Sequence, residues 1–148
     1  MEKINKWEKT LNFSLYKNLI LSKIPKRNTT YDITNVTNDK IDIIIDLSTQ
    51  KNSYDIPTNS KYYQFKFEKK KILEDDKINL IMNILDKNRD KKILIHCHYG
   101  FNRTGFVFVN YLCNDGYKLN EALNIFTKLR GRGIKYIELL TYLKNKFE

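Results

Sequence analysis

The chain has 148 residues, a length that suits one domain with a hydrophobic core, so we predict a single domain over residues 1–148. Hydrophobic residues make up 41% of the chain and aromatic residues 13%, which excludes an intrinsically disordered protein. No apolar run is long enough to span a bilayer. The net charge of +10 indicates either an anionic partner, such as a nucleic acid, or the lysine-rich composition of an AT-biased genome.

Two further features of the sequence indicate the cellular compartment. The basic residues at the N-terminus are not followed by the apolar stretch of a signal peptide. The chain has 2 cysteines, too few for a disulfide framework. Both observations predict an intracellular protein in a reducing compartment, with no membrane association.

The apolar pattern predicts strands and helices in the order β, β, β, α, β, α, α, α. Compact β-branched or aromatic runs predict four strands, at residues 19–21, 41–47, 62–67 and 93–96. Apolar residues at helical spacing predict four helices, at residues 75–85, 104–113, 119–126 and 136–147. This order predicts an α/β fold with a short, mostly parallel central sheet and helices on both of its faces. In such sheets, ligands bind beyond the carboxyl ends of the strands.

The most informative stretch follows the last predicted strand. Residues 96–105 read HCHYGFNRTG and lead into the helix predicted from Thr104. A strand, a tight loop and a helix N-terminus form a cradle of backbone N–H groups for a phosphate dianion. Arg103 adds a planar guanidinium that can bind two phosphoryl oxygens. The predicted phosphate-binding residues are His98, Tyr99, Gly100, Phe101, Asn102 and Arg103.

Cys97 lies at the base of this cradle and is the predicted nucleophile. The helix dipole, the backbone N–H groups and Arg103 all favour its thiolate, which can attack phosphorus. Thr104 is expected to donate its hydroxyl to the sulfur and so help the thiolate to leave in a second step. The predicted path runs through a phosphocysteine and needs no metal and no other cofactor. The alternative is a catalytically inactive phosphate-binding module, but every residue that the chemistry needs is present.

These ten residues resemble the signature loop of the cysteine-dependent phosphatases, the superfamily of protein tyrosine and dual-specificity phosphatases. The full string is most similar to the RNA 5′-triphosphatase branch, which includes the capping-enzyme triphosphatase domain and the baculovirus phosphatase. That branch usually has Thr-His where this chain has His98 and Tyr99. The resemblance continues in shared order through residues 46–67 and 129–140. No guanylyltransferase sequence follows within these 148 residues, so if the protein processes RNA ends we expect it to resemble the free-standing viral type more than the bifunctional capping enzyme.

Protein phosphatases of this superfamily carry an Asp on a mobile loop that protonates the leaving group. The corresponding residues 68–76 show no such pattern. The nominal candidates are Glu68, Glu74, Asp75 and Asp76. The two aspartates are equally typical of a helix N-terminus. A phosphoanhydride tolerates a missing acid, because its leaving phosphate has a second pKa of about 6. Lysines 69–71 would suit a polyphosphate, unless they are a solvated surface run.

Two positions outside the loop complete the predicted site. The resemblance implies that Asp46 lies near the active site and assists catalysis indirectly, whereas a strand-end Asp is more typical of a turn cap. Arg130 and Arg132 follow a helix that should end near the loop, and we expect them to hold the α- or β-phosphate. The predicted substrates are RNA 5′ ends, with phosphoproteins as the alternative, and the oligomeric state is not predicted.

Overall fold

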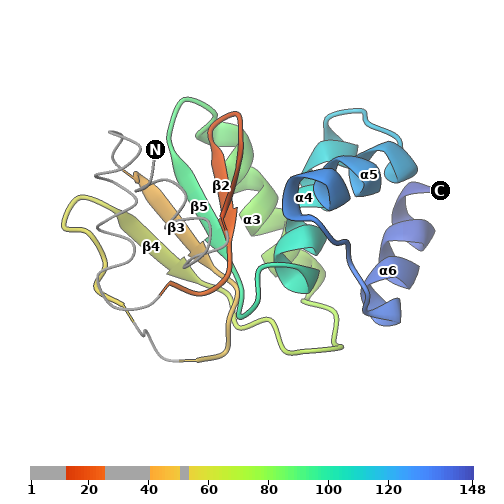
Figure 1. Cartoon of the computed structure of the whole chain (residues 1–148), viewed down its shortest axis with the longest axis horizontal. Helices are drawn as coiled ribbons and strands as arrows, with labels where there is room; N and C mark the ends of the chain where they lie inside the picture. The colour runs from red at the N-terminus through yellow and green to blue at the C-terminus, as the bar shows by residue number, and fades with distance from the viewer. Residues whose placement is uncertain (1–12, 26–40, 51–53) are drawn as a thin grey trace.

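The computed structural model describes residues 13–25, 41–50 and 54–148, and a five-stranded sheet forms its centre (Figure 1). The strands are β1 (Ser14–Tyr16), β2 (Leu19–Ser22), β3 (Ile43–Asp46), β4 (Lys61–Gln64) and β5 (Ile93–His96). Their order in the sheet is β1-β2-β5-β3-β4, and every pairing is parallel except the antiparallel β1–β2 hairpin. The predicted α/β class and mostly parallel sheet are therefore confirmed.

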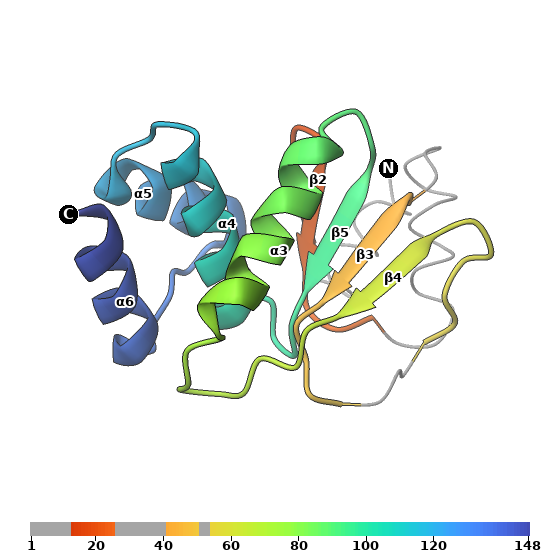
Figure 2. The ribbon, with the colours of Figure 1, turned by 180° about the vertical axis from the view of Figure 1, so that it is seen from behind.

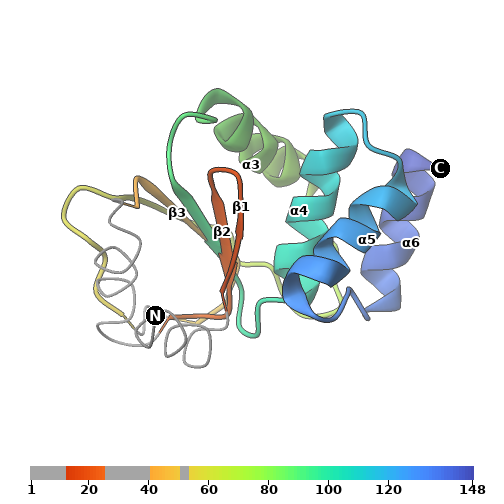
Figure 3. The same cartoon turned by 45° about the horizontal axis from the view of Figure 1, so that its top comes forward.

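The described helices all lie on one side of this sheet. They are α3 (Asp75–Lys87), α4 (Asn102–Asn114), α5 (Leu119–Arg130) and α6 (Ile137–Phe147). Figure 2 shows α3 lying against the strands, and Figure 3 shows α4 between the sheet and α6. Within the described ranges no helix covers the opposite face, so the four helices, which were expected on both faces, are found on one. No described helix is both long and apolar enough to cross a membrane.

The alternation of side chains along the strands builds two separate cores. Ile43 and Ile45 belong to the large cluster that includes the helices, whereas Ile44 belongs to a smaller cluster with Tyr54 and Leu94. Successive side chains of a strand point to opposite faces, so these clusters lie on opposite sides of the sheet. All residues of β3 and β5 are buried, as is usual for parallel strands covered on both faces.

One strand and several element boundaries differ from those predicted from the sequence. The sequence does not predict β1, because three residues are too few to show an alternation; the hairpin turns at Lys17, which has a left-handed φ of 51°. The strand predicted at 62–67 ends at Gln64. The helix predicted from Thr104 begins at Asn102, which places Arg103 within its first turn.

Candidate active site

Cys97 lies directly beyond the carboxyl end of β5, the middle strand of the sheet. β5 pairs in parallel with β2 on one side and with β3 on the other, so its end is fixed from both sides. Residues 97–101 form the phosphate loop, and α4 begins at Asn102. The loop therefore lies at a helix N-terminus, where backbone N–H groups and the helix dipole favour an anion.

Two hydrogen-bond donors contact the buried sulfur of Cys97. The hydroxyl of Thr104 donates to Sγ at 3.1 Å, and the backbone N–H of Gly100 donates to Sγ at 3.2 Å. Hydrogen bonds to the charged form of a group stabilise that form, so both contacts favour the thiolate. The Thr104 hydroxyl lies where its predicted role, easing the departure of the sulfur, requires it.

Gly100 lies close to the backbone that follows β2. Its φ is +84°, a conformation that glycine adopts without strain. A Cβ added here would lie 2.6 Å from the carbonyl carbon of Ser22, from the backbone nitrogen of Lys23 and from the guanidinium of Arg130. Only glycine fits this position, and the loop is consequently seated against the end of β2.

Arg103 is buried in the first turn of α4. One terminal nitrogen of its guanidinium donates to the backbone carbonyl of Phe67 at 2.8 Å. A carbonyl orients the guanidinium without neutralising its charge, and no described carboxylate forms an ion pair with it. Arg103 thus keeps a full positive charge beside Cys97 for an anionic ligand.

Arg130 supports the loop from the protein interior. Its Nε donates to the carbonyl of Gly100 at 3.0 Å, and a terminal nitrogen donates to the hydroxyl of Ser14 at 3.1 Å. Burial lowers the pKa of Arg130 to about 10, an effect that the negative charge of Cys97 opposes, so the side chain stays protonated at neutral pH. These contacts make Arg130 a support for the Gly100 carbonyl, and the phosphate contact expected from the sequence stays a prediction.

The far end of the loop is tied to the segment between α5 and α6. The side-chain oxygen of Asn102 accepts hydrogen bonds from the backbone N–H groups of Lys135 (2.7 Å) and Tyr136 (3.0 Å). The ring of Phe101 lies 4.6 Å from the guanidinium carbon of exposed Arg132. Asn102 therefore holds the loop in place with its side chain, and Arg132 is positioned at the rim of the site.

The opposite rim is formed by His98 and Tyr99. Their rings meet edge to face at 4.4 Å, and Nδ1 of His98 lies 3.1 Å from the amide nitrogen of Gln50. The Lys69 ammonium lies 5.6 Å from the centre of the Tyr99 ring. Partial burial lowers the pKa of His98, and the charges of Arg103 and Lys69 lower it further. His98 is therefore neutral at pH 7 in a positive local field.

Asp46 points away from Cys97, and its expected indirect role in catalysis stays a prediction beside the alternative of a turn cap. It lies on the face of the sheet that carries Ile44, whereas Cys97 belongs to the core on the other face. One carboxylate oxygen accepts hydrogen bonds from the backbone and hydroxyl of Ser48 (2.8 and 2.7 Å), and the other accepts one from the Tyr62 hydroxyl. The carboxylate caps the turn after β3.

His96 belongs to the same buried cluster as Asp46. Its Nε2 lies 2.6 Å from the Tyr54 hydroxyl, and its Nδ1 lies 3.7 Å from a carboxylate oxygen of Asp46. Burial lowers the pKa of His96, an effect that Asp46 opposes. As expected from its position next to Cys97 on an extended chain, the ring points away from the sulfur and anchors the start of the loop.

The four carboxylates considered as proton donors either contact other side chains or lie at the start of α3. Glu68 forms an ion pair with Lys71 at 3.0 Å, and Asp75 accepts a hydrogen bond from the Tyr142 hydroxyl at 2.6 Å. Glu74 is the N-cap residue of α3, and Asp76 lies in its first turn. Within the described ranges, no contact directs a carboxylate towards Cys97, and no group of three or more His, Cys, Asp or Glu side chains could hold a metal ion.

Comparison with known proteins agrees with this geometry. The family model of the dual specificity phosphatase catalytic domain matches residues 25–146. The chain belongs to this family. A solved structure of kinase associated phosphatase, in which the catalytic-site cysteine is replaced by serine, has a TM-score of 0.78 and 18% identity, covering 93% of this chain and 96% of that one. The protein is therefore a cysteine-dependent phosphatase, with Cys97 present at the position of the nucleophile.

Two curated relatives carry names connected with RNA. An RNA/RNP complex-1-interacting phosphatase of Bos taurus is 29% identical over 118 residues, covering 73% of this chain and 36% of the relative. An mRNA-capping enzyme of Caenorhabditis elegans is 38% identical over 61 residues, covering 40% of this chain and 10% of the relative. The phosphatase chain thus matches about a third, or less, of the length of these relatives.

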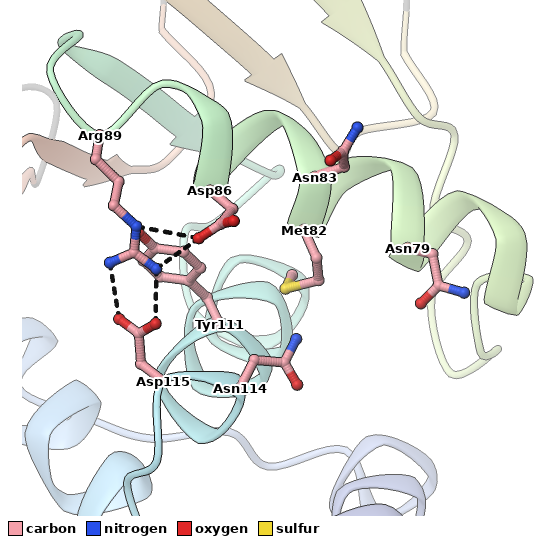
Figure 4. Close-up of a pocket in the computed structure, with 8 residues that line it drawn as sticks. All are labelled: Asn79, Met82, Asn83, Asp86, Arg89, Tyr111, Asn114 and Asp115. Carbon is pink, nitrogen blue, oxygen red and sulfur yellow. Dashed lines mark hydrogen bonds and ion pairs between the residues drawn. The ribbon is translucent and has the colours of Figure 1, made fainter.

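A groove of about 330 Å³ lies at the other end of α4, between α3 and α4 (Figure 4). Arg89 and Asp115 face each other at one end of it, and Arg89 also contacts Asp86. Three asparagines, Met82 and Tyr111 line the remainder. Because α4 has 13 residues, this groove is about 20 Å from the phosphate loop and is separate from the active site.

Three supporting residues were not found from the sequence. They are Ser14, Gln50 and Phe67, which contact Arg130, His98 and Arg103 respectively. Phe67 contacts Arg103 through its backbone carbonyl, a group that every residue has, so its side chain gives no indication of this contact. Ser14 and Gln50 are ordinary surface residue types, and only the folded chain brings them to the loop.

Proposed function

We propose that this phosphatase is a metal-independent RNA 5′-triphosphatase that removes the γ-phosphate, and then the β-phosphate, through Cys97. The observation that supports the proposal best is the charge arrangement of the site. Arg103, Lys69 and Arg132 present positive charge around the nucleophile without a carboxylate partner among the described residues, and no carboxylate is directed at Cys97. Such a site suits a substrate with much negative charge and a good leaving group.

The first step transfers a phosphoryl group to the protein. The Cys97 thiolate attacks the γ-phosphorus, an S–P bond forms, and the bond from the γ-phosphorus to the bridging oxygen breaks. The electron pair stays on the RNA, which leaves with a 5′-diphosphate. Arg103 and the backbone N–H groups of the loop stabilise the charge on the equatorial oxygens of the transition state.

The second step releases the phosphoryl group. A water oxygen attacks the phosphorus, the S–P bond breaks, and the phosphate leaves as H₂PO₄⁻, which carries both protons of the water. The sulfur departs as a thiolate, which the Thr104 hydroxyl and the Gly100 N–H stabilise through the contacts already present. Both Cys97 and Arg103 are then ready for a further cycle.

The leaving group explains why a missing acid is tolerable. A diphosphate end departs from an anhydride with little protonation, because the second pKa of a phosphate is about 6. A tyrosine phenolate has a pKa of about 10, so its departure needs a proton donor. The names of the two relatives agree with an RNA substrate.

A dual-specificity protein phosphatase is the second candidate function. It is favoured by the family match over residues 25–146. A protein substrate would need an acid brought to the site, and Glu68 is the nearest candidate along the chain because it follows Phe67, whose carbonyl holds Arg103. The two candidates therefore differ in their dependence on residue 68.

The test compares two substrates in the presence of EDTA. We expect phosphate release from γ-labelled triphosphate RNA to exceed release from a phosphotyrosine peptide by at least about tenfold in kcat/KM. Cys97→Ser should abolish release, and Cys113→Ser, which removes the half-buried second cysteine on α4, is the matched control. Peptide turnover well above RNA turnover would refute the RNA function, and full activity of Cys97→Ser would refute the mechanism.

A further inference from the structure

Tyr99 is an exposed aromatic residue on the phosphate loop itself. It lies two residues beyond Cys97, and 58% of its surface is exposed. The other large apolar side chains that are exposed in the described ranges are aliphatic: Leu15, Ile72, Leu80 and Ile137. Two residues of chain span at most about 7 Å, so the ring belongs to the mouth of the site.

The Tyr99 ring is held in place before any substrate binds. The edge-to-face contact with His98 at 4.4 Å fixes one side, and His98 is fixed in turn by Gln50. The carbonyl of Gln50 accepts a hydrogen bond at 2.8 Å from Gln64, the last residue of β4. A ring oriented in advance loses little conformational entropy on binding, which makes it an effective contact surface.

Positive charge lies beside this ring. The Lys69 ammonium is 5.6 Å from the ring centre, and Arg103 adds its charge deeper in the site. More than half of the Tyr99 side chain remains exposed despite these neighbours. An aromatic ring next to cations along one path is the combination by which proteins bind single-stranded nucleic acid, through base stacking and phosphate contacts.

We propose that Tyr99 stacks against the first nucleobase of the RNA 5′ end while Lys69 contacts the phosphates between that base and Cys97. This inference rests on the proposed function. In a 5′-triphosphate, two phosphates and a ribose separate the base from the attacked phosphorus, so the base lies outside the loop, where Tyr99 is exposed. The ring of a phosphotyrosine is bonded directly to the attacked phosphate and would lie deeper, above Cys97.

The test uses binding in the Cys97→Ser background, with a short triphosphate RNA that carries 2-aminopurine as its first nucleotide. Binding should quench the fluorophore, because stacking on an aromatic ring quenches it. Adding Tyr99→Ala should remove the quenching and raise Kd about 5- to 150-fold, whereas Tyr99→Phe should retain both properties. Leu80→Ala removes an exposed apolar side chain on α3 and is the control.

A second substrate separates stacking from damage to the loop. Inorganic tripolyphosphate has no base, so Tyr99→Ala should weaken RNA binding at least about fivefold more than tripolyphosphate binding. Lys69→Met should lower the slope of log Kd against log salt by about 0.7, and Lys87→Met on α3 should leave it unchanged. Equal losses for both ligands, or a Tyr99→Phe variant as weak as Tyr99→Ala, would overturn the inference.

The stacking role of Tyr99 and the RNA triphosphatase activity predict different results, so each can be refuted separately. If the wild type hydrolyses triphosphate RNA but Tyr99→Ala affects RNA and tripolyphosphate equally, only the stacking role is refuted. If the wild type hydrolyses the phosphotyrosine peptide and not the RNA, the proposed function is refuted and the stacking role falls with it.

Discussion

Two arginines at opposite ends of α4 have opposite surroundings. Arg89 follows α3 in the chain and lies beside the C-terminal end of α4. It donates to both Asp115 (2.6 and 2.9 Å) and Asp86 (2.8 and 3.1 Å). The two carboxylates raise the pKa of Arg89, and Arg89 lowers the pKa of Asp115. Arg103 lies in the first turn of α4, and its described hydrogen bond goes to the carbonyl of Phe67.

The different hydrogen-bond partners of Arg89 and Arg103 indicate different roles for the two side chains. Fixed carboxylates neutralise Arg89, so it joins α3 to the end of α4 and attracts no further anion. A neutral carbonyl orients Arg103 at the positive end of the α4 dipole, and no described carboxylate forms an ion pair with it. The folded protein therefore carries an excess of positive charge around Cys97 that a phosphate can neutralise.

The largest expected effect comes from changing the shape of the cation at the loop. Arg103→Lys keeps the charge but loses the fork that binds two oxygens, and kcat should fall about 100- to 1000-fold. Arg89→Lys is the matched control at the other end of α4 and should leave kcat/KM unchanged. The measurement is steady-state kinetics on whichever of triphosphate RNA and the phosphotyrosine peptide is hydrolysed faster. An Arg103→Lys variant that kept more than a tenth of the wild-type kcat would contradict the proposed difference between Arg103 and Arg89.

Loss of the hydroxyl at Thr104 should have the next largest effect. A hydrogen bond to a charged group contributes about 1.5–3 kcal/mol, so Thr104→Ala should lower kcat about 10- to 100-fold. The effect falls on the second step, because the hydroxyl stabilises the departing thiolate. Rapid-quench kinetics should then show a burst of the first product followed by slow turnover. Thr104→Ser keeps the donor and should restore single-phase kinetics, whereas a wild-type rate for Thr104→Ala would rule out this role.

The buried cluster behind the loop should make stability depend on pH. The folded-state pKa of His96 lies below the usual 6.5, so the unfolded chain binds a proton as pH falls through 6.5 while the folded protein does not. The free energy of unfolding should consequently fall below pH 6.5, by up to about 1.4 kcal/mol per pH unit, and be unaffected by this group above it. Urea unfolding at pH 7.5 and 5.5 should show a smaller difference for His96→Asn than for the wild type. His98→Asn provides the control for the more exposed ring, and equal slopes for His96→Asn and wild type would disprove the effect.

The smallest effect is expected at the neutralised arginine. Arg89→Met removes a half-exposed ion pair, and the free energy of unfolding should fall by about 1 kcal/mol or less. This corresponds to a decrease of about 2–4 °C in Tm. Phosphate release should stay at the wild-type rate. A large loss of activity in Arg89→Met would mean that the two ends of α4 are coupled, and the contrast between the two arginines would fail.

The sequence predicted the parts of the site that depend on local spacing. Cys97, Gly100, Arg103 and Thr104 lie on one short loop between a strand and a helix, so their mutual positions follow from the chain itself. The structure places the Thr104 hydroxyl and the Gly100 N–H on the sulfur accordingly. The assignment of individual catalytic roles to these residues stays a prediction that the kinetics above test.

The sequence could not predict which long-range neighbours complete the loop. The resemblance places Asp46 near the site, and the alternation within β3 turns its side chain to the face of the sheet opposite Cys97. The sequence predicts a phosphate contact for Arg130, and the structure adds that its buried side chain donates to the Gly100 carbonyl. Strand register and burial determine these contacts, and neither is visible in a single sequence, whereas the catalytic roles of both residues stay predictions.

The short β1–β2 hairpin bears on where the folded domain begins. The family match begins at residue 25, after both strands have ended. Ser14 of β1 nevertheless binds the arginine that holds Gly100, and β2 pairs along the whole of β5, which carries Cys97 at its end. A fragment cut at the family boundary would lose two of five strands and the brace behind the nucleophile. The region matched by the family model is therefore smaller than the folded structure that supports Cys97.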